Sequence, residues 1–250
     1  MFILFSFIVM RMSGAVFFNP ILGRSNIPGA VKTAFVFMLS LMMYMGIGGE
    51  LQHEPQSLLE FGFLLITELA FGFVIGFCME LTVLVIRFAS SVMDFGMGLS
   101  MAQTYDPQYN MQVTVTSGLY YAFFVLLFFA VDGHVKLIEI FYRSSEVIPF
   151  GMVKINSELS AAMLGIFSQA IVLGLRFAFP LLAMELVTEF AVGILMKIIP
   201  QINVFVVNFQ LKIIVGMMIL LLLFTPMADR FYTLLDQMFA WLQELVTIMG

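Results

Sequence analysis

Several ionisable side chains stand within long apolar stretches of this sequence, where a charge is unusual. Glu80, Arg87 and Asp94 are spaced seven residues apart and fall near one stripe of a helix. Neighbours along that stripe are about 10.5 Å apart, too far to pair with one another. Glu185 and Glu189 form an i, i+4 pair of like charges, which is mildly destabilising on its own. These groups are the candidates for acid–base chemistry, proton relay or metal binding.

The sequence offers little else that such chemistry needs. It contains two His and one Cys, and neither an HExxH nor a GxSxG motif occurs. Asp132 and His134, in the stretch DGHVKL, are better explained as a polar helix boundary than as a metal or proton site. We therefore predict no catalytic residue, no metal site and no cofactor, and expect that the protein is not an enzyme. The net charge of -5 argues against a surface that binds nucleic acid.

The composition indicates a membrane protein. Hydrophobic residues make up 62% of the chain and charged residues 11%, and the mean hydropathy is +1.05. A charged side chain costs about 2.5–3.5 kcal/mol at the centre of a spanning helix. The ionisable groups must therefore face protein or water, and we expect many of their partners on other subunits. The charges predicted to contact other subunits are Glu80, Arg87, Asp94, Arg176, Glu185 and Glu189.

The elements that must position these charges are long helices. Apolar helical segments are predicted over residues 1–18, 30–48, 59–103, 113–143, 159–197 and 204–228, with an amphipathic helix over 229–250. As single helices, the third and fifth of these segments would extend roughly 67 Å and 58 Å, whereas a bilayer core is about 30 Å thick. Either these runs fold back as hairpins, or they extend beyond the lipid inside a larger protein body. The expected fold is all-α and membrane-associated, with long kinked helices and helical hairpins.

Glycine and methionine are concentrated after the third segment, where residues 94–112 read DFGMGLSMAQTYDPQYNMQ. Gly96 and Gly98 are closely spaced, and Asp106-Pro107 predicts a turn. Because methionine is flexible and polarizable, such a segment can seal against irregular partners and yield when pushed. An ordinary connecting loop explains the same residues, and the residues alone leave both interpretations open. Within the third segment, Gly72 and Gly76 form a GxxxG pair that favours close helix packing.

Several motifs occur in a characteristic order. They are RMSGAVFFNPILGRSNIPGAVKTAF, GMGLSMAQTYDP, DGH, RSSEVIP and GLRFAFPLLAMELVTEFAVGILMKIIPQINVFVVNFQLKIIVG. Together they resemble the FliR family of flagellar biosynthesis proteins, which is homologous to the SctT component of virulence type III secretion systems. The resemblance covers nearly the whole chain, and its sharpest element is KIIPQINVF at residues 197–205.

The resemblance implies a core subunit of a flagellar type III export gate, built with FliP-like and FliQ-like subunits. FlhB-like and FlhA-like components are further expected partners, as are exported unfolded proteins and membrane lipid. The implied location is the bacterial inner membrane, in the flagellar basal body, with an extension to the periplasmic side left open. The chain would comprise a FliP-like portion, 1–158, and a FliQ-like helical hairpin with a C-terminal amphipathic helix, 159–250.

The resemblance also assigns roles to two segments. Residues 96–110 correspond to a loop that plugs the channel, with Met97, Met101 and Tyr105 expected to fill its bore. The plug residues are Gly96, Met97, Gly98, Met101, Tyr105, Asp106 and Pro107. The polar stretch around residue 200 corresponds to a subunit-contacting hairpin tip on the cytoplasmic side. The tip residues are Lys197, Pro200, Gln201 and Asn203.

Two alternatives remain beside the flagellar gate. One is an SctT-type component of a virulence secretion system, with the same fold and different cargo. The other is a proton-coupled secondary transporter that uses Glu80, Arg87, Glu185 and Glu189 as a proton relay. The transporter predicts an inverted repeat, and we find no convincing internal repeat in the sequence.

Overall fold

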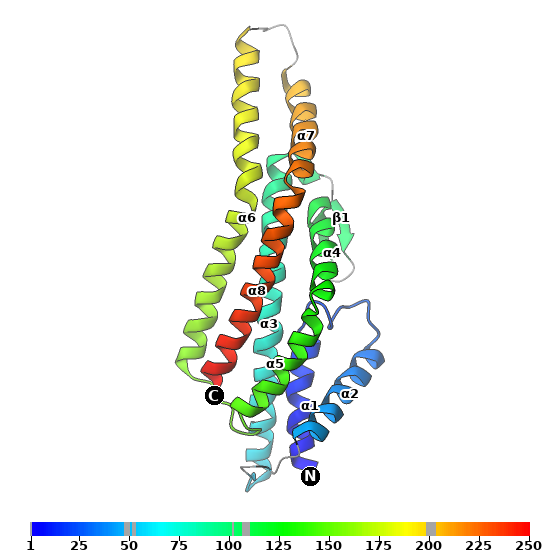
Figure 1. Ribbon diagram of the computed structural model, residues 1–250, viewed down its shortest axis with the longest axis vertical. Helices are drawn as coiled ribbons and strands as arrows, with labels where there is room; N and C mark the ends of the chain where they lie inside the picture. The colour runs from blue at the N-terminus through cyan, green and yellow to red at the C-terminus, as the bar shows by residue number, and fades with distance from the viewer. Residues whose placement is uncertain (1, 48–50, 52–53, 102, 107–110, 199–203) are drawn as a thin grey trace. The chain divides into compact units, whose positions relative to one another are not determined.

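The computed structural model describes residues 2–47, 51, 54–101, 103–106, 111–198 and 204–250. These residues form helices joined by short links (Figure 1). The α-helices are α1 Phe2–Phe17, α2 Gly29–Ile47, α3 Leu58–Gly96, α4 Val115–Ala130, α5 Gly133–Val147, α6 Ser157–Ile198, α7 Val204–Leu222 and α8 Phe224–Met249. A 3-10 helix, η1 Leu99–Met101, and the strands β1 Gln103–Asp106 and β2 Met111–Thr114 complete the described elements. The all-α class is confirmed, with one small β-ribbon in addition.

The two longest helices are continuous. α3 has 39 residues and α6 has 42, with Pro180 inside α6. At 1.5 Å per residue they extend about 58 Å and 63 Å, roughly twice the apolar core of a bilayer. Neither run folds back on itself, so the expectation of hairpins within these segments is wrong. Their extension beyond the lipid inside a larger protein body stays a prediction.

Membrane-crossing candidates are present by length and composition. Among the described residues, three helices contain such a segment: Gly29–Gly46, Leu58–Gly96 and Ser157–Leu195. The pair Asn208–Leu222 and Phe224–Met249, bent by 62°, would make a fourth if it forms one span. The structure therefore has the membrane-spanning helices that the composition predicted.

The chain divides into two compact units that alternate along the sequence. The first comprises Met1–Val83, Phe128–Ser168 and Leu235–Gly250, and the second comprises Leu84–Leu127 and Gln169–Leu234. Each unit contains residues from both the FliP-like portion, 1–158, and the FliQ-like portion, 159–250, that the resemblance implies. The boundary between these portions therefore stays a prediction.

A buried ion pair lies in the first unit. Arg11 of α1 and Glu68 of α3 are both fully buried. Arg11 Nε lies 2.6 Å from Glu68 Oε2, and Nη2 lies 3.1 Å from Oε1. The Ile148 carbonyl accepts from both Nη atoms at 3.2 Å, and the Gly151 amide donates to Glu68 Oε1 at 2.7 Å. Both charges are therefore paired and further hydrogen-bonded, as burial requires.

The same arginine packs between aromatic rings. Its guanidinium carbon lies 4.5 Å from the ring centroid of Phe71 and 4.2 Å from that of Phe150. Close approach of α1 to α3 is permitted by Gly72, where a Cβ would lie 2.6 Å from the Ala15 nitrogen. The close helix packing predicted from the GxxxG pair is confirmed at this position.

α8 is amphipathic, as predicted for residues 229–250, and it begins earlier, at Phe224. Its buried apolar residues include Phe231, Leu234, Leu235, Met238, Leu242 and Leu245. Trp241 is 1% exposed, so this ring lies in the protein interior and not at a water interface. The apolar stripe of α8 is therefore covered within the chain.

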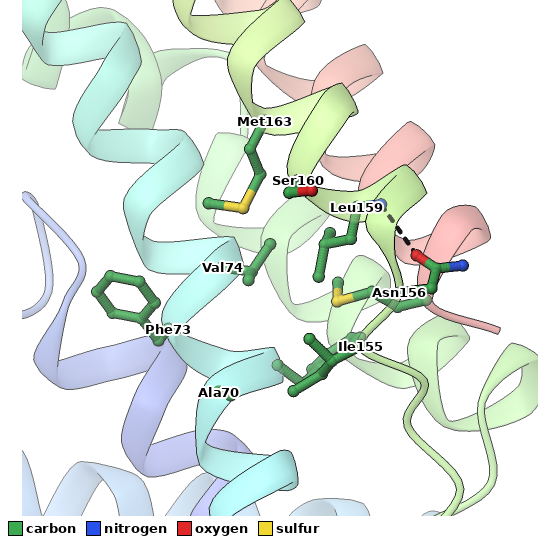
Figure 2. A pocket seen from close by; sticks show the side chains of 10 residues that line it. Ala70, Phe73, Val74, Ile155, Asn156, Leu159, Ser160 and Met163 are labelled. Carbon is green, nitrogen blue, oxygen red and sulfur yellow. Dashed lines mark hydrogen bonds between the residues drawn. The ribbon is translucent and has the colours of Figure 1, made fainter.

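An apolar hollow of about 220 Å³ lies in the first unit beside α3, next to the start of α6 (Figure 2). Its polar side chains serve the helix start. Asn156 Oδ1 accepts from the Leu159 amide at 2.9 Å, and the Ser160 hydroxyl donates to the Ser157 carbonyl at 2.8 Å. Apart from these groups its walls are hydrocarbon and methionine sulfur, which offer no acid, base or nucleophile.

Candidate functional site

The segment expected to plug a channel, residues 96–110, lies in the second unit between α3 and α4. After α3 the chain makes the short helix η1 and enters β1, which pairs antiparallel with β2 beside α4 (Figure 1). The register runs from Gln103↔Thr114 to Asp106↔Met111. Tyr105, on β1, is 59% exposed, whereas Pro107 lies outside the described residues. The sequence predicted a turn at this place but not a ribbon.

Gly98 ends the long helix α3. Its φ is +75°, in the left-handed region that glycine adopts without strain. The Met97 amide donates to the Met93 carbonyl at 3.0 Å and the Gly98 amide to the Phe95 carbonyl at 3.1 Å, which closes the last turn. The helix predicted to reach residue 103 therefore stops earlier, and Gly98 terminates it.

Met97 lies at the base of the segment and does not project from it. Its side chain is fully buried beside Gly216 of α7, where a Cβ would lie 2.8 Å from Met97 Sδ. On the other side of the base, a Cβ at Gly96 would lie 3.3 Å from Leu182 Cδ2 of α6. Met97 thus differs from the expectation of a bore-filling residue, and the Met101 side chain lies outside what the structure describes.

Asp94 ties the two ends of the segment together. This carboxylate is fully buried near the end of α3. It accepts a hydrogen bond from the Thr116 amide at 3.2 Å and another from the Thr116 hydroxyl, at the first turn of α4. An acidic group satisfies the open N–H donors of a helix start and interacts favourably with its dipole. Asp94 and Thr116, which flank the 96–110 segment, therefore hold the base of this segment together.

Glu185 of α6 lies at the same base, as a buried carboxylate. It is 4% exposed, and neither of its carboxylate oxygens has a hydrogen-bond partner among the described residues. A Cβ at Gly216 would lie 2.7 Å from Glu185 Oε1, and a Cβ at Gly96 would lie 3.8 Å from Glu185 Cγ. Glu189, one turn further along, is exposed and pairs with Lys212 of α7. The two glutamates of the i, i+4 pair therefore occupy different environments.

These contacts also define how α6 and α7 run. Glu185 lies opposite Gly216, and Glu189 opposite Lys212, so each pair is equally distant from positions 200–201. This is the pattern of two antiparallel helices that form a hairpin, and the two run side by side (Figure 1). Lys197 is exposed in the last turn of α6, while the predicted tip residues Pro200, Gln201 and Asn203 lie outside the described residues.

The structure separates the other predicted charges. Glu80 and Arg87 are half-buried, and the Arg87 guanidinium carbon lies 5.8 Å from the ring centroid of Tyr121. Arg176 is exposed. Asp94 and Glu189 have partners within the chain, although partners on other subunits were expected for many charges. Whether any of the six contacts another subunit stays a prediction.

Sequence reasoning missed three parts of these sites. Thr116 and Gly216 carry no motif, and their roles come from distant residues that fold against them. The Arg11–Glu68 pair was also missed, although a lone arginine within an apolar helix is a signal that a buried acidic partner exists. Within the described residues, no group of three His, Cys, Asp or Glu side chains is placed to hold a metal ion.

Comparison with known proteins places this arrangement in a family. Over residues 2–238 the chain matches bacterial export proteins, family 1. It is similar to the flagellar biosynthetic protein FliR of Escherichia coli strain K12, with 26% identity over 241 residues, 96% of this chain and 91% of the relative. FliR of Bacillus subtilis strain 168 is 26% identical over 223 residues, 87% of this chain and 84% of the relative.

A relative with a different name is similar over a comparable range. The surface presentation of antigens protein SpaR of Shigella flexneri is 22% identical over 220 residues, 87% of this chain and 84% of the relative. The resemblance seen in the motifs thus extends along nearly the whole chain. The chain belongs to the bacterial export proteins, family 1, the FliR family, which is a family of export components and not of enzymes.

Proposed function

We propose that this chain is a core subunit of the flagellar type III protein export gate. It forms, with FliP-like and FliQ-like subunits, the channel through which unfolded flagellar subunits leave the cytoplasm. FlhB-like and FlhA-like components join the assembly in the inner membrane, at the flagellar basal body. The observation that carries the proposal is the family match over residues 2–238. It is supported by the buried contact between Asp94 and Thr116, the residues that flank the 96–110 segment.

Exposed apolar surface supports an assembly of several subunits. Beyond Pro180, α6 exposes Leu186 at 65%, Val187 at 64% and Phe190 at 75%. The same helix is about 63 Å long by its rise, so lipid covers at most about half of it. Large exposed apolar patches outside lipid are characteristic of protein interfaces. Other helical subunits are the natural cover for this surface.

The contrast between the base of the 96–110 segment and its ribbon supports the closure role. The base is fixed by the buried Asp94–Thr116 contact and by Met97. The ribbon is a single two-stranded hairpin, a structure that is only marginally stable by itself. In this proposal the ribbon lies across the channel, and a substrate that is pushed through displaces it while the base holds.

The test is to shorten the ribbon without disturbing its base. Gln103 and Thr114 are cross-strand partners, so two glycines can join them in place of residues 104–113. This variant is expected to raise the permeability of the cell membrane to ions and small solutes, since the base remains and the closing element is gone. Unchanged permeability in cells that assemble the complex normally contradicts the plug role.

A matched pair of point variants refines this test. Tyr105 on the ribbon is 59% exposed, and Tyr232 on α8 is 43% exposed. Tyr105→Ala is expected to raise permeability, and Tyr232→Ala to leave it unchanged, because only the first residue lies on the ribbon. Equal effects of the two variants would show that the ribbon has no special part in closure.

A virulence secretion apparatus is the second candidate, supported by the similarity to SpaR at 22% identity. The fold and the closure role would be the same, with effector proteins as cargo. Restored motility after this chain is expressed in a strain that lacks its flagellar counterpart favours the flagellar gate. Restored effector secretion without motility favours the second candidate.

A further inference from the structure

A second hollow, of about 460 Å³, opens on the surface of the second unit where α6 and α8 pass each other. This volume is within the range of small-ligand pockets, about 300–1,000 Å³. Two arginines, Arg176 of α6 and Arg230 of α8, contribute the charge. The lining residues are Val172, Leu175, Arg176, Phe179, Pro180 and Arg230.

No acidic residue lines this hollow. The ion pairs of the described residues include neither Arg176 nor Arg230. Asp229 precedes Arg230, but consecutive residues of a helix do not face each other, and Asp229 is not part of the lining. Two like charges are thus held around one hollow without a counter-ion from the described chain, and an anion is the complementary ligand.

The walls beside the arginines are apolar and exposed. Val172 is 44% exposed, Leu175 47% and Phe179 67%. A ligand that satisfies the whole site therefore carries an anionic group for the guanidiniums and a hydrocarbon part for these side chains. Phosphate suits the first requirement, because each guanidinium can donate two parallel hydrogen bonds to its oxygens.

The position of Arg176 along α6 agrees with this chemistry. The helix extends about 28 Å from Ser157 to Arg176 and about 33 Å from Arg176 to Ile198, by its rise per residue. Each half is about as long as the bilayer core is thick, about 30 Å. A span that occupied either of these halves would end near Arg176, where the phosphates of the lipid lie.

We propose that Arg176 and Arg230 form a binding site for the phosphate of an anionic phospholipid, whose acyl chains lie along Val172, Leu175 and Phe179. Basic pockets between spanning helices bind lipid head groups in this way. The site is independent of the proposed export role, since it requires only that the chain lies in a bilayer.

Native mass spectrometry of the complex that contains this chain tests the site. The complex is delipidated in detergent and titrated with phosphatidylglycerol or with phosphatidylcholine, and bound lipids are counted. Arg176→Gln/Arg230→Gln is compared with Arg143→Gln, a control arginine that is also exposed but pairs with Glu139. Retained subunit composition and an unchanged melting temperature establish that the variants are folded.

The wild type is expected to retain phosphatidylglycerol in preference to phosphatidylcholine, and 10 mM inorganic phosphate to compete weakly because it has no acyl chain. Each arginine lost is expected to lower the affinity for phosphatidylglycerol about fivefold, and both about thirtyfold. The Arg143 variant should bind like the wild type.

Equal binding of the two lipids, or undiminished phosphatidylglycerol binding by the double variant, overturns the proposal. If the double variant loses a protein subunit but keeps its bound lipid, the proposal is also overturned, and the partner of Arg176 and Arg230 is then a carboxylate of another protein.

Discussion

Removing the Thr116 hydroxyl tests how the base of the 96–110 segment is held. Asp94 is fully buried and accepts hydrogen bonds from the amide and the hydroxyl of Thr116, 22 residues away. Thr116→Val keeps the shape and the amide but removes one bond to a charged acceptor. Such a bond contributes about 1.5–3 kcal/mol, more than a neutral one. The closed base should therefore become about 10-fold to 150-fold less favoured relative to an open one.

The assay is the permeability of membranes that contain the assembled complex, measured as uptake of a small dye or as ion conductance. Thr82→Val is the matched control, because Thr82 is equally buried and its hydroxyl donates to Cys78 within α3. We expect a leak from Thr116→Val and from Asp94→Asn, and none from Thr82→Val. Asp94→Asn/Thr116→Val should leak less than the sum of its two single variants, because both substitutions break the same contact. Wild-type permeability in both single variants refutes the account of the base.

Three further predictions concern the two units. Arg11→Met should lower the free energy of unfolding by about 3–5 kcal/mol, because it leaves the buried Glu68 without its ion-pair partner, and Arg11→Met/Glu68→Leu should recover most of that loss. Denaturation of the purified complex measures both variants, and a double variant as unstable as the single one contradicts the pairing. Gly216→Ala places a Cβ 2.7 Å from Glu185 Oε1 and against Met97, so it should lower the free energy of unfolding by about 1–3 kcal/mol and raise permeability. A substitution that changes neither the free energy of unfolding nor the permeability counts against this packing. Glu185→Met should raise the melting temperature of the complex, because it removes a buried carboxylate that has no hydrogen-bond partner in the described part of the chain. A lower melting temperature would contradict this reasoning and reveal a partner that stabilises Glu185 in the assembly.

The long helices could be predicted from the sequence because their apolar character is continuous and local. The end of α3 could not, since the run of apolar residues continues past the point where the left-handed Gly98 stops the helix. The β-ribbon was missed because its first strand, Gln103–Asp106, is short and polar, and its pairing partner Met111–Thr114 is a separate stretch of the chain. Local pattern thus located the elements but not all of their boundaries.

The site was predicted as a segment but not as a set of contacts. The charges at Asp94 and Glu189 were singled out correctly as unusual, yet their partners Thr116 and Lys212 lie 22 and 23 residues away in the chain. The distance is larger still for Arg11 and Glu68, which are 57 residues apart. Spacing along one helix indicates which side chains share a face, but it carries no information about which distant element packs against that face.

The central claim is that these helices form part of a channel built from several protein subunits. The mass of the intact complex tests this claim most directly. The complex is extracted from the membrane under mild conditions and weighed by native mass spectrometry. The account predicts a particle far heavier than the 28.1 kDa of this chain, with other helical subunits present in a fixed ratio. A particle of 28.1 kDa that is stable and fully active alone would contradict it.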